Sequence, residues 1–127
     1  MSIQIKNIAF TGTPVTDMKQ ARAFYEGVLG LNPAHIFELG ASSWVEYDIG
    51  PGNATLAITD AMPEWKPSAE GTSVALEVAD FDAAIAHLKA NNVPILNDPF
   101  DTPVCRSMLI TDPAGNTICI HHCKQAS

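Results

Sequence analysis

Four soft metal donors gather near the C-terminal end of this sequence: Cys105, Cys119, His121 and Cys123. Alternate side chains of a β-strand point to the same face, so Cys119, His121 and Cys123 share one face of a strand that begins at Thr117. Thiolates and imidazoles are ligands of zinc and copper. A metal site is therefore one hypothesis. The other, which we prefer, is a group of reduced thiols beside a histidine that binds no metal.

A hairpin would bring the fourth donor to this face. Residues 112–116 read Asp-Pro-Ala-Gly-Asn, which has the composition of a turn between two strands. If the residues that flank this turn pair with each other, Cys105 lies opposite Cys123. The same register places Ser107 opposite His121.

Two glutamates are candidate general bases. Glu46 lies in a predicted strand over residues 43–49 and Glu77 in a predicted strand over residues 72–78. A carboxylate that is desolvated in a cleft has a raised pKa and can accept a proton near neutral pH. The alternative is that each carboxylate lies at a solvated strand end and takes no part in catalysis.

Aromatic side chains are candidates for the wall of a ligand site. Phe10, Trp44 and Tyr47 would supply a large contact area that can stack on flat ligands. Ordinary core packing is the alternative for all three. Trp65 lies in a proline-rich stretch, where it could cover the mouth of a cleft or contact a second subunit.

Two similar series of elements position these residues. The first is expected to comprise a strand over 3–10 that continues irregularly through 11–14, a helix that begins after Asp17 and ends at Gly30, and strands over 35–39, 43–49 and 54–59. The second is expected to comprise a strand over 72–78, a helix from Asp80 to Asn91, and strands over 94–96, 105–111 and 117–122.

Matching positions of the two series are separated by nearly the same number of residues along the sequence. Asp80 follows Asp17 by 63 residues, and Pro113 follows Pro51 by 62. An internal duplication explains this and predicts an α+β fold of two tandem βαβββ modules in one domain over 1–127: module one over 3–60, a linker over 61–71 and module two over 72–123. Each helix covers only one face of its sheet, so the other faces should form a shared concave cleft.

Composition excludes several classes of partner. The chain has 127 residues, which suits one domain, and a formal net charge of −7, which repels nucleic acid and anionic lipid. It has no apolar run of about 18 residues that could span a membrane. Three cysteines form no disulfide framework. We therefore expect a cytoplasmic protein that binds neither nucleic acid nor membranes.

Three short stretches carry a family resemblance. Residues 14–18 read Pro-Val-Thr-Asp-Met, residues 23–31 read Ala-Phe-Tyr-Glu-Gly-Val-Leu-Gly-Leu, and residues 112–116 read Asp-Pro-Ala-Gly-Asn. In order and spacing they resemble the vicinal-oxygen-chelate superfamily of glyoxalases, bleomycin-resistance proteins and extradiol dioxygenases. The resemblance covers nearly the whole chain and implies the two-module fold. It implies no single activity, because the superfamily includes lyases, isomerases, dioxygenases and drug-sequestering proteins.

The resemblance also identifies positions where a metal would be bound. Metal-dependent members of the family take His, Glu or Gln ligands from the first and last strand of each module. The corresponding positions here hold Ser73 and Cys119 in module two, and Ala57 with either Phe10 or Asn7 in module one. These residues do not make the donor set of a hard divalent cation, so we expect no metal and no cofactor.

The resemblance and the missing ligands together imply a metal-independent small-molecule-binding protein, for which the drug-sequestering members of the family are the model. Its site is expected to be lined by Phe10, Trp44, Tyr47, Ser73, Leu109, Cys119 and His121. One alternative is a lyase- or dioxygenase-like enzyme with an atypical metal site or none, which uses Glu46 or Glu77 with His121. Another is a regulatory or assembly module whose cleft binds nothing. Because single-domain relatives complete their clefts between subunits, the resemblance also implies a homodimer.

Overall fold

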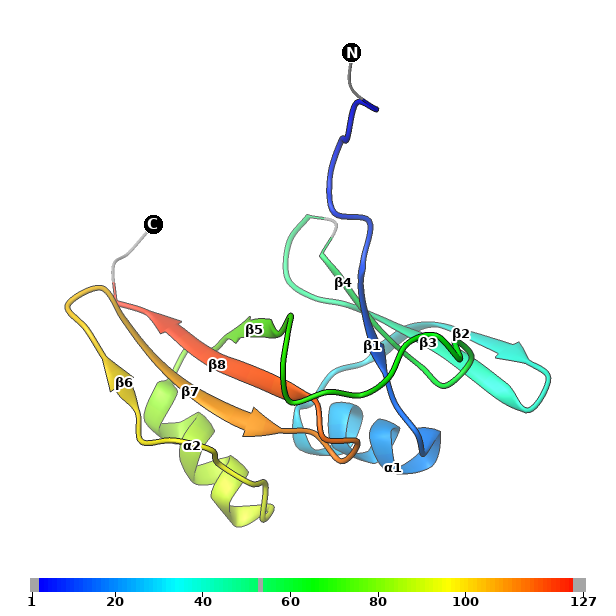
Figure 1. Cartoon of the computed structure of the whole chain (residues 1–127). Helices are drawn as coiled ribbons and strands as arrows, with labels where there is room; N and C mark the ends of the chain where they lie inside the picture. The colour runs from blue at the N-terminus through cyan, green and yellow to red at the C-terminus, as the bar shows by residue number, and fades with distance from the viewer. Residues whose placement is uncertain (1–2, 53, 125–127) are drawn as a thin grey trace. The chain divides into compact units, whose positions relative to one another are not determined.

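The chain divides into two units, each with its own sheet and helix. The computed structural model describes residues 3–52 and 54–124. Unit 1 is Met1–Lys66 and unit 2 is Pro67–Ser127, so the boundary falls inside the predicted linker over 61–71. Each unit has a four-stranded sheet and the element order βαβββ, which confirms the α+β fold and the two modules (Figure 1).

Unit 1 forms a mixed sheet. Its elements are β1 (Thr11–Pro14), α1 (Met18–Arg22), the π-helical turn η1 (Ala23–Val28), β2 (Pro33–Leu39), β3 (Ser42–Asp48) and β4 (Thr55–Thr59). The strand order is β1-β4-β3-β2. Strand β1 runs parallel to β4, and the other neighbours are antiparallel.

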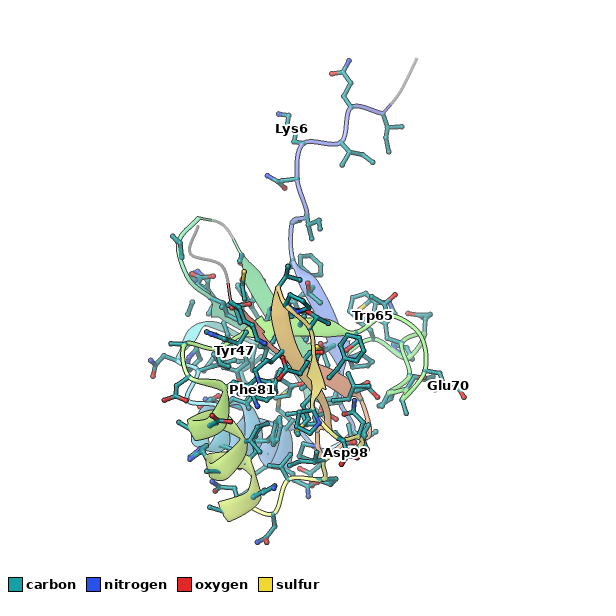
Figure 2. The ribbon with its side chains drawn as sticks, turned by 90° about the vertical axis from the view of Figure 1, so that its left-hand side faces the viewer. Lys6, Tyr47, Trp65, Glu70, Phe81 and Asp98 are labelled. Atoms are coloured by element: carbon teal, nitrogen blue, oxygen red, sulfur yellow. The ribbon has the colours of Figure 1, made fainter. Side chains whose placement is uncertain are left out.

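The strand predicted over 3–10 is wrong, and only its predicted extension over 11–14 forms a strand. Residues 3–10 are all described and form no strand, and the first strand is Thr11–Pro14. The apolar pattern was misleading, because Ile3 and Ile8 are more than four-fifths exposed. The stretch around Lys6 runs away from the strands of unit 1 (Figure 2). Strand β4 has five residues, and on its parallel side it pairs with Thr11–Pro14.

The helix of unit 1 begins and ends where the sequence predicts. Asp17 caps it, since its Oδ1 accepts a hydrogen bond of 3.0 Å from the backbone N–H of Gln20. Gly30 follows the helix with φ of 77°, a conformation that glycine adopts at little cost. The buried side chains beneath the helical segment come from both helix and strands: Phe24, Tyr25, Val45, Tyr47, Leu56 and Ile58.

Unit 2 repeats this plan. Its elements are β5 (Val74–Glu77), α2 (Phe81–Ala90), β6 (Phe100–Asp101), β7 (Cys105–Thr111) and β8 (Thr117–Cys123), in the strand order β5-β8-β7-β6. Asp80 caps α2 by accepting a 3.0 Å hydrogen bond from Ala83 N–H. The core of the unit includes Phe81, which Figure 2 labels, with Leu88, Met108, Ile110, Ile118 and Ile120.

The strand predicted over 94–96 is reduced to a single bridge between Ile95 and Ile110. The reason lies at the next hydrogen bond along β7, where the backbone N–H of Leu109 donates to Asn97 Oδ1 at 2.8 Å. A side chain there takes the place of a backbone carbonyl, so pairing stops. It resumes at β6, where Phe100 lies opposite Ser107. Among the described residues, no helix is long and apolar enough to cross a bilayer.

Candidate functional site

One face of the unit 1 sheet carries aromatic rings. Val45 and Tyr47 of β3 point toward the helix, where Tyr47 stacks on Tyr25 at 6.2 Å between ring centroids. Trp44 and Glu46 alternate with them and therefore point to the opposite face. We call this opposite face the open face of unit 1.

Three rings gather on the open face, and we call them the aromatic cluster: Phe10, Trp44 and Trp65. The ring of Phe10 meets that of Trp44 edge-on, with centroids 5.1 Å apart, and the centroid of the Trp65 ring lies 6.0 Å from that of Trp44. Phe10 is 41 % exposed, and both tryptophans are partly exposed. The cluster therefore keeps ring surface that a ligand could cover.

A glycine makes room for Trp65. A Cβ atom at Gly12 would lie 2.6 Å from Cζ3 and 2.8 Å from Cη2 of Trp65, closer than carbon atoms can approach. The indole therefore lies directly over the backbone of β1. Gly12 pairs with Ala57, which pairs with Glu46, so three strands present small or polar residues beside the cluster.

Strand β2 extends the open face. Phe37 lies opposite Trp44 and His35 lies opposite Glu46, so both side chains share the face of the cluster. Their rings stack at 6.1 Å between centroids. Sequence reasoning missed both residues. The alternation of residues 35–39 indicates that His35 and Phe37 share one face of the strand. The register that brings Phe37 beside Trp44 could not be predicted from the sequence.

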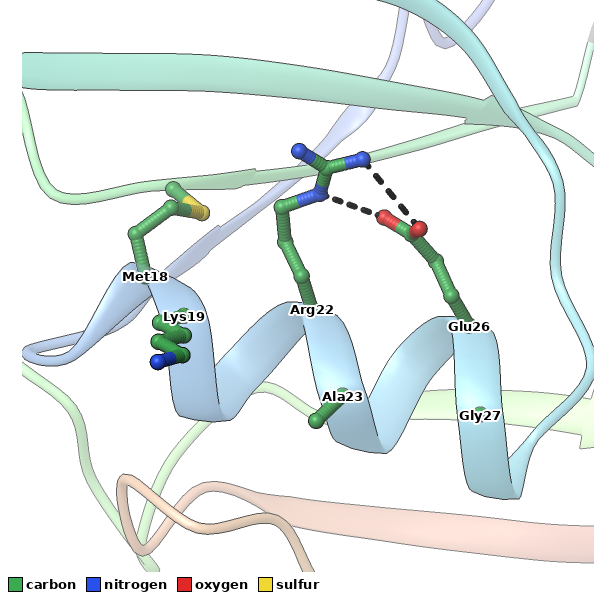
Figure 3. Close-up of a pocket in the computed structure, with 6 residues that line it drawn as sticks. All are labelled: Met18, Lys19, Arg22, Ala23, Glu26 and Gly27. Atoms are coloured by element: carbon green, nitrogen blue, oxygen red, sulfur yellow. Dashed lines mark hydrogen bonds and ion pairs between the residues drawn. The ribbon is translucent and has the colours of Figure 1, made fainter.

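Tyr47 lies apart from the rings with which it was grouped in the sequence. Its hydroxyl donates a 2.9 Å hydrogen bond to Oε2 of Glu26, and Glu26 also pairs with Arg22 Nε at 2.6 Å. Arg22 and Glu26 help to line a shallow hollow along α1 and η1 (Figure 3). Burial, and then the hydrogen bond to Glu26, raise the pKa of Tyr47. We therefore leave Tyr47 out of the proposed ligand site.

The corresponding face of the unit 2 sheet carries the polar and thiol residues that were grouped from the sequence. Cys105 pairs with Cys123, Ser107 with His121 and Leu109 with Cys119, so the predicted hairpin register is confirmed. Ser73 precedes β5, and its hydroxyl donates a 2.6 Å hydrogen bond to the carbonyl of Thr117.

Glu77 and His121 form an ion pair on this face. Oε1 of Glu77 lies 2.6 Å from Nδ1 of His121, and its Oε2 accepts a 2.7 Å hydrogen bond from Cys123 N–H. The Cys123 bond and then the His121 bond lower the pKa of Glu77, and the Glu77 bond raises the pKa of His121. A lowered pKa makes Glu77 a weak proton acceptor, which is the opposite of what a general base needs.

The residues at the family's metal positions do not fit a hard divalent cation. Ala57 offers a methyl group, Phe10 a ring, and the Ser73 hydroxyl is already bonded within the protein. The softer alternative fares no better: over residues 3–52 and 54–124, no three His, Cys, Asp or Glu side chains are grouped so as to hold a metal ion. The zinc or copper hypothesis for the C-terminal cysteines is thus not supported.

Comparisons with known proteins agree with the two-module fold. A structure of the antibiotic binding protein TnmS3 from Streptomyces sp. CB03234 superposes with a TM-score of 0.79 at 23% identity, over 97% of this chain and 100% of that one. A glyoxalase/bleomycin resistance protein from the same organism gives 0.72 at 26% identity, over 90% and 98%. Lactoylglutathione lyase from Agrobacterium tumefaciens gives 0.68 at 22% identity, over 94% and 95%.

The sequence itself decides the family. A search of curated proteins finds no match. The model of the Glyoxalase/Bleomycin resistance protein/Dioxygenase superfamily matches residues 7–120, which include all three stretches that carried the resemblance. This chain therefore belongs to the Glyoxalase/Bleomycin resistance protein/Dioxygenase superfamily.

Proposed function

We propose that this protein binds a flat, aromatic small molecule on the open face of unit 1, without a metal and without converting it. The observation that carries the proposal is the aromatic cluster, in which Phe10 and Trp65 both lie beside Trp44 and all three rings stay partly exposed. Family membership and the similarity to an antibiotic binding protein support a small-molecule ligand.

The cluster has the properties of a stacking site. Aromatic rings prefer edge-to-face or offset contacts, and a planar ligand can add a further ring to such a group. Trp65 belongs to the segment that follows β4, whereas Trp44 belongs to β3, so two separate segments supply the indoles. A ligand that stacks on these rings or between them would bury apolar surface, and each Å² buried would favour binding by about 25 cal/mol.

Glu46 supplies the polar group that such a site needs for orientation. Its Oε2 accepts the Trp44 Nε1–H at 2.9 Å, which leaves Oε1 available to a hydroxyl or amine of the ligand. A negative carboxylate beside rings favours a ligand that carries a positive charge or a hydrogen-bond donor. Binding pockets commonly combine apolar walls with a few polar groups in this way.

The sequence contains only two tryptophans, and both belong to the cluster, so intrinsic tryptophan fluorescence reports on this site alone. The full chain would be titrated with planar polycyclic antibiotics and dyes, and with saturated compounds of similar size as controls. We expect saturable quenching by planar compounds only, and recovery of each compound unchanged by chromatography. Rapid conversion of a bound compound would instead favour an enzyme.

Calorimetry of variants would locate the site. Phe10→Ala should weaken binding of a planar ligand at least about tenfold, which corresponds to about 1.4 kcal/mol. Ile36→Ala is the matched control, because Ile36 is similarly exposed on β2 but pairs with Val45, whose side chain points toward the helix. Equal losses in the two variants would show that the cluster is not the site.

Three further expectations remain predictions. Ligand contacts were predicted for Ser73, Leu109, Cys119 and His121 of unit 2, and Leu109→Ala would test them in the same titration. A homodimer would be recognised by sedimentation equilibrium of the untagged chain. The cytoplasmic location requires localisation of the tagged protein in cells.

A further inference from the structure

Cys105 and Cys123 lie directly opposite each other on β7 and β8. The next pair along the ladder is hydrogen-bonded, since Lys124 N–H donates to the carbonyl of Val104 at 2.9 Å. Hydrogen-bonded and non-hydrogen-bonded pairs alternate in an antiparallel ladder, so the cysteine pair is of the non-hydrogen-bonded kind. In such pairs the Cα atoms are about 4.5 Å apart. Disulfides require about 4.4–6.8 Å between Cα atoms, so the backbone is already placed for a cross-strand bond.

The thiol of Cys105 is also placed for deprotonation. Thr102 Oγ1 lies 3.6 Å from its sulfur. The hydrogen bond with Thr102, and then the neighbouring His121, lower the pKa of Cys105. Oε1 of Glu77 in turn lies 2.6 Å from Nδ1 of His121, and a carboxylate beside an imidazole favours its protonated form. Thr102 and a protonated His121 nearby thus favour a thiolate at Cys105.

The third cysteine has a different environment. Cys119 lies opposite Leu109, and burial is the main cause that raises its pKa. Cys119 is partly exposed, but a thiol that stays protonated reacts slowly with oxidants. Cys123 is exposed, and Cys105 is partly exposed. The lowered pKa of Cys105 suits a nucleophile, and the exposure of Cys123 suits a thiol that resolves the oxidised form. The raised pKa of Cys119 suits a thiol that does not react.

We propose that Cys105 is a peroxide-reactive thiolate and that Cys123 resolves its oxidised form as an intramolecular disulfide. The Cys105 thiolate attacks one oxygen of a hydroperoxide, an S–O bond forms, the O–O bond breaks, and the leaving oxygen takes a proton to give an alcohol or water. The Cys123 thiol then attacks the sulfenic sulfur. The S–S bond forms, the S–O bond breaks, and the hydroxide leaves with the thiol proton as water.

The electrons of this sequence balance. The two thiols lose two electrons in total, and the peroxide gains them as its O–O bond is cleaved. A small dithiol reverses the change by thiol–disulfide exchange. This site lies on unit 2, and its reactivity does not depend on the ligand proposed for unit 1.

The test treats the reduced full chain with one equivalent of hydrogen peroxide, followed by thiol counting and mass spectrometry. We expect the number of thiols to fall from three to one, the mass to fall by two hydrogens, and the Cys105 and Cys123 peptides to be linked. Dithiothreitol should restore all three thiols. A linkage that includes Cys119, a disulfide between two chains, or thiols that oxidise no faster than glutathione would overturn the proposal.

Variants assign the roles. Cys119→Ser should form the disulfide at the wild-type rate, and Cys105→Ser should form none. Cys123→Ser should stop at the sulfenic acid of Cys105, which dimedone traps. Glu77→Gln should slow the first step several-fold, with the disulfide still formed. If Cys105→Ser consumes peroxide at the wild-type rate, the assignment is wrong. Circular dichroism of each variant verifies folding, and the wild-type linkage decides the proposal even if one variant misfolds.

Discussion

The indole Nε1 of Trp44 donates a 2.9 Å hydrogen bond to Oε2 of Glu46, two residues further along the same strand. The bond is possible because residues i and i+2 of a strand point to one face. It ties the carboxylate to the aromatic cluster and leaves its second oxygen open to a ligand. The charge of Glu46 and the ring of Trp44 can therefore be tested separately.

Glu46→Gln removes the charge but keeps an oxygen that can accept from the indole. We expect the affinity for a cationic planar ligand to fall about tenfold and the affinity for a neutral planar ligand to change less than about threefold. Calorimetric titration measures both. Glu38→Gln is the matched control, because Glu38 follows Phe37 in β2 and its side chain therefore points to the opposite face of the sheet. An equal loss for both ligands would argue against a charge contact at Glu46.

Gly12→Ala tests the contact beneath Trp65. The new methyl group would lie 2.6 Å from the Trp65 ring, so the indole must shift from its present position beside Trp44. We expect a red shift of tryptophan emission and weaker binding of planar ligands, with the free energy of unfolding lowered by less than about 1 kcal/mol, because a side-chain end can yield.

Gly27→Ala provides the comparison for that variant. A Cβ atom at Gly27 meets nothing within 4 Å, and the residue lies in a helical segment. Alanine should therefore raise the free energy of unfolding by about 0.5–1 kcal/mol and leave the emission spectrum unchanged. Urea unfolding and fluorescence measure both variants. An unshifted spectrum in Gly12→Ala would contradict the placement of Trp65.

Much of the fold could be predicted because local signals and long-range pairing agree. Asp17 and Asp80 cap the two helices as expected, and the strand over 105–111 has its predicted bounds. The wrong strand over 3–10 shows where local signals fail. Its alternating isoleucines suit a strand, but β4 is too short to pair with so long a segment.

The candidate site was harder to predict, because it depends on register and on contacts across loops. Trp44 and Phe10 were recognised as candidates, but only the geometry shows that Trp65 completes the cluster over Gly12. Tyr47 was grouped with Trp44 by residue type, although a spacing of three in a strand puts the two on opposite faces. The hairpin register of the cysteines was accessible, since a short turn fixes it.

Tyr47→Phe tests the hydrogen-bonded core of unit 1. The tyrosine is fully buried, and its hydroxyl donates to Glu26, which Arg22 also binds. Removing the donor should lower the free energy of unfolding by about 1–2 kcal/mol, as expected for a buried hydrogen bond to a charged group. Thr55→Val removes an exposed hydrogen bond to Asp48 and should cost less than about 0.5 kcal/mol. Equal costs in urea unfolding would contradict the role of Tyr47.

The ion pair of Glu77 and His121 makes the stability of unit 2 depend on pH. The folded pKa of Glu77 is lowered, so its stabilisation is present above the unfolded pKa of about 4.3 and is lost as pH falls through the folded pKa. The folded pKa of His121 is raised, so its stabilisation is present below about 6.5 and is lost as pH rises through the folded pKa. The pair therefore stabilises most between these limits.

Glu77→Gln should remove this dependence. We expect the free energy of unfolding in urea to differ from the wild type most at about pH 5.5, between the two unfolded pKa values. The difference should shrink as pH rises beyond about 6.5 and His121 loses its proton. Glu70→Gln is the control, because it changes the same charge on an exposed loop of the same unit (Figure 2). A difference that stays constant from about pH 5 to about pH 8.5 would show that the charge on His121 contributes nothing to stability. In that case Thr102, and not His121, would be the residue that stabilises the Cys105 thiolate.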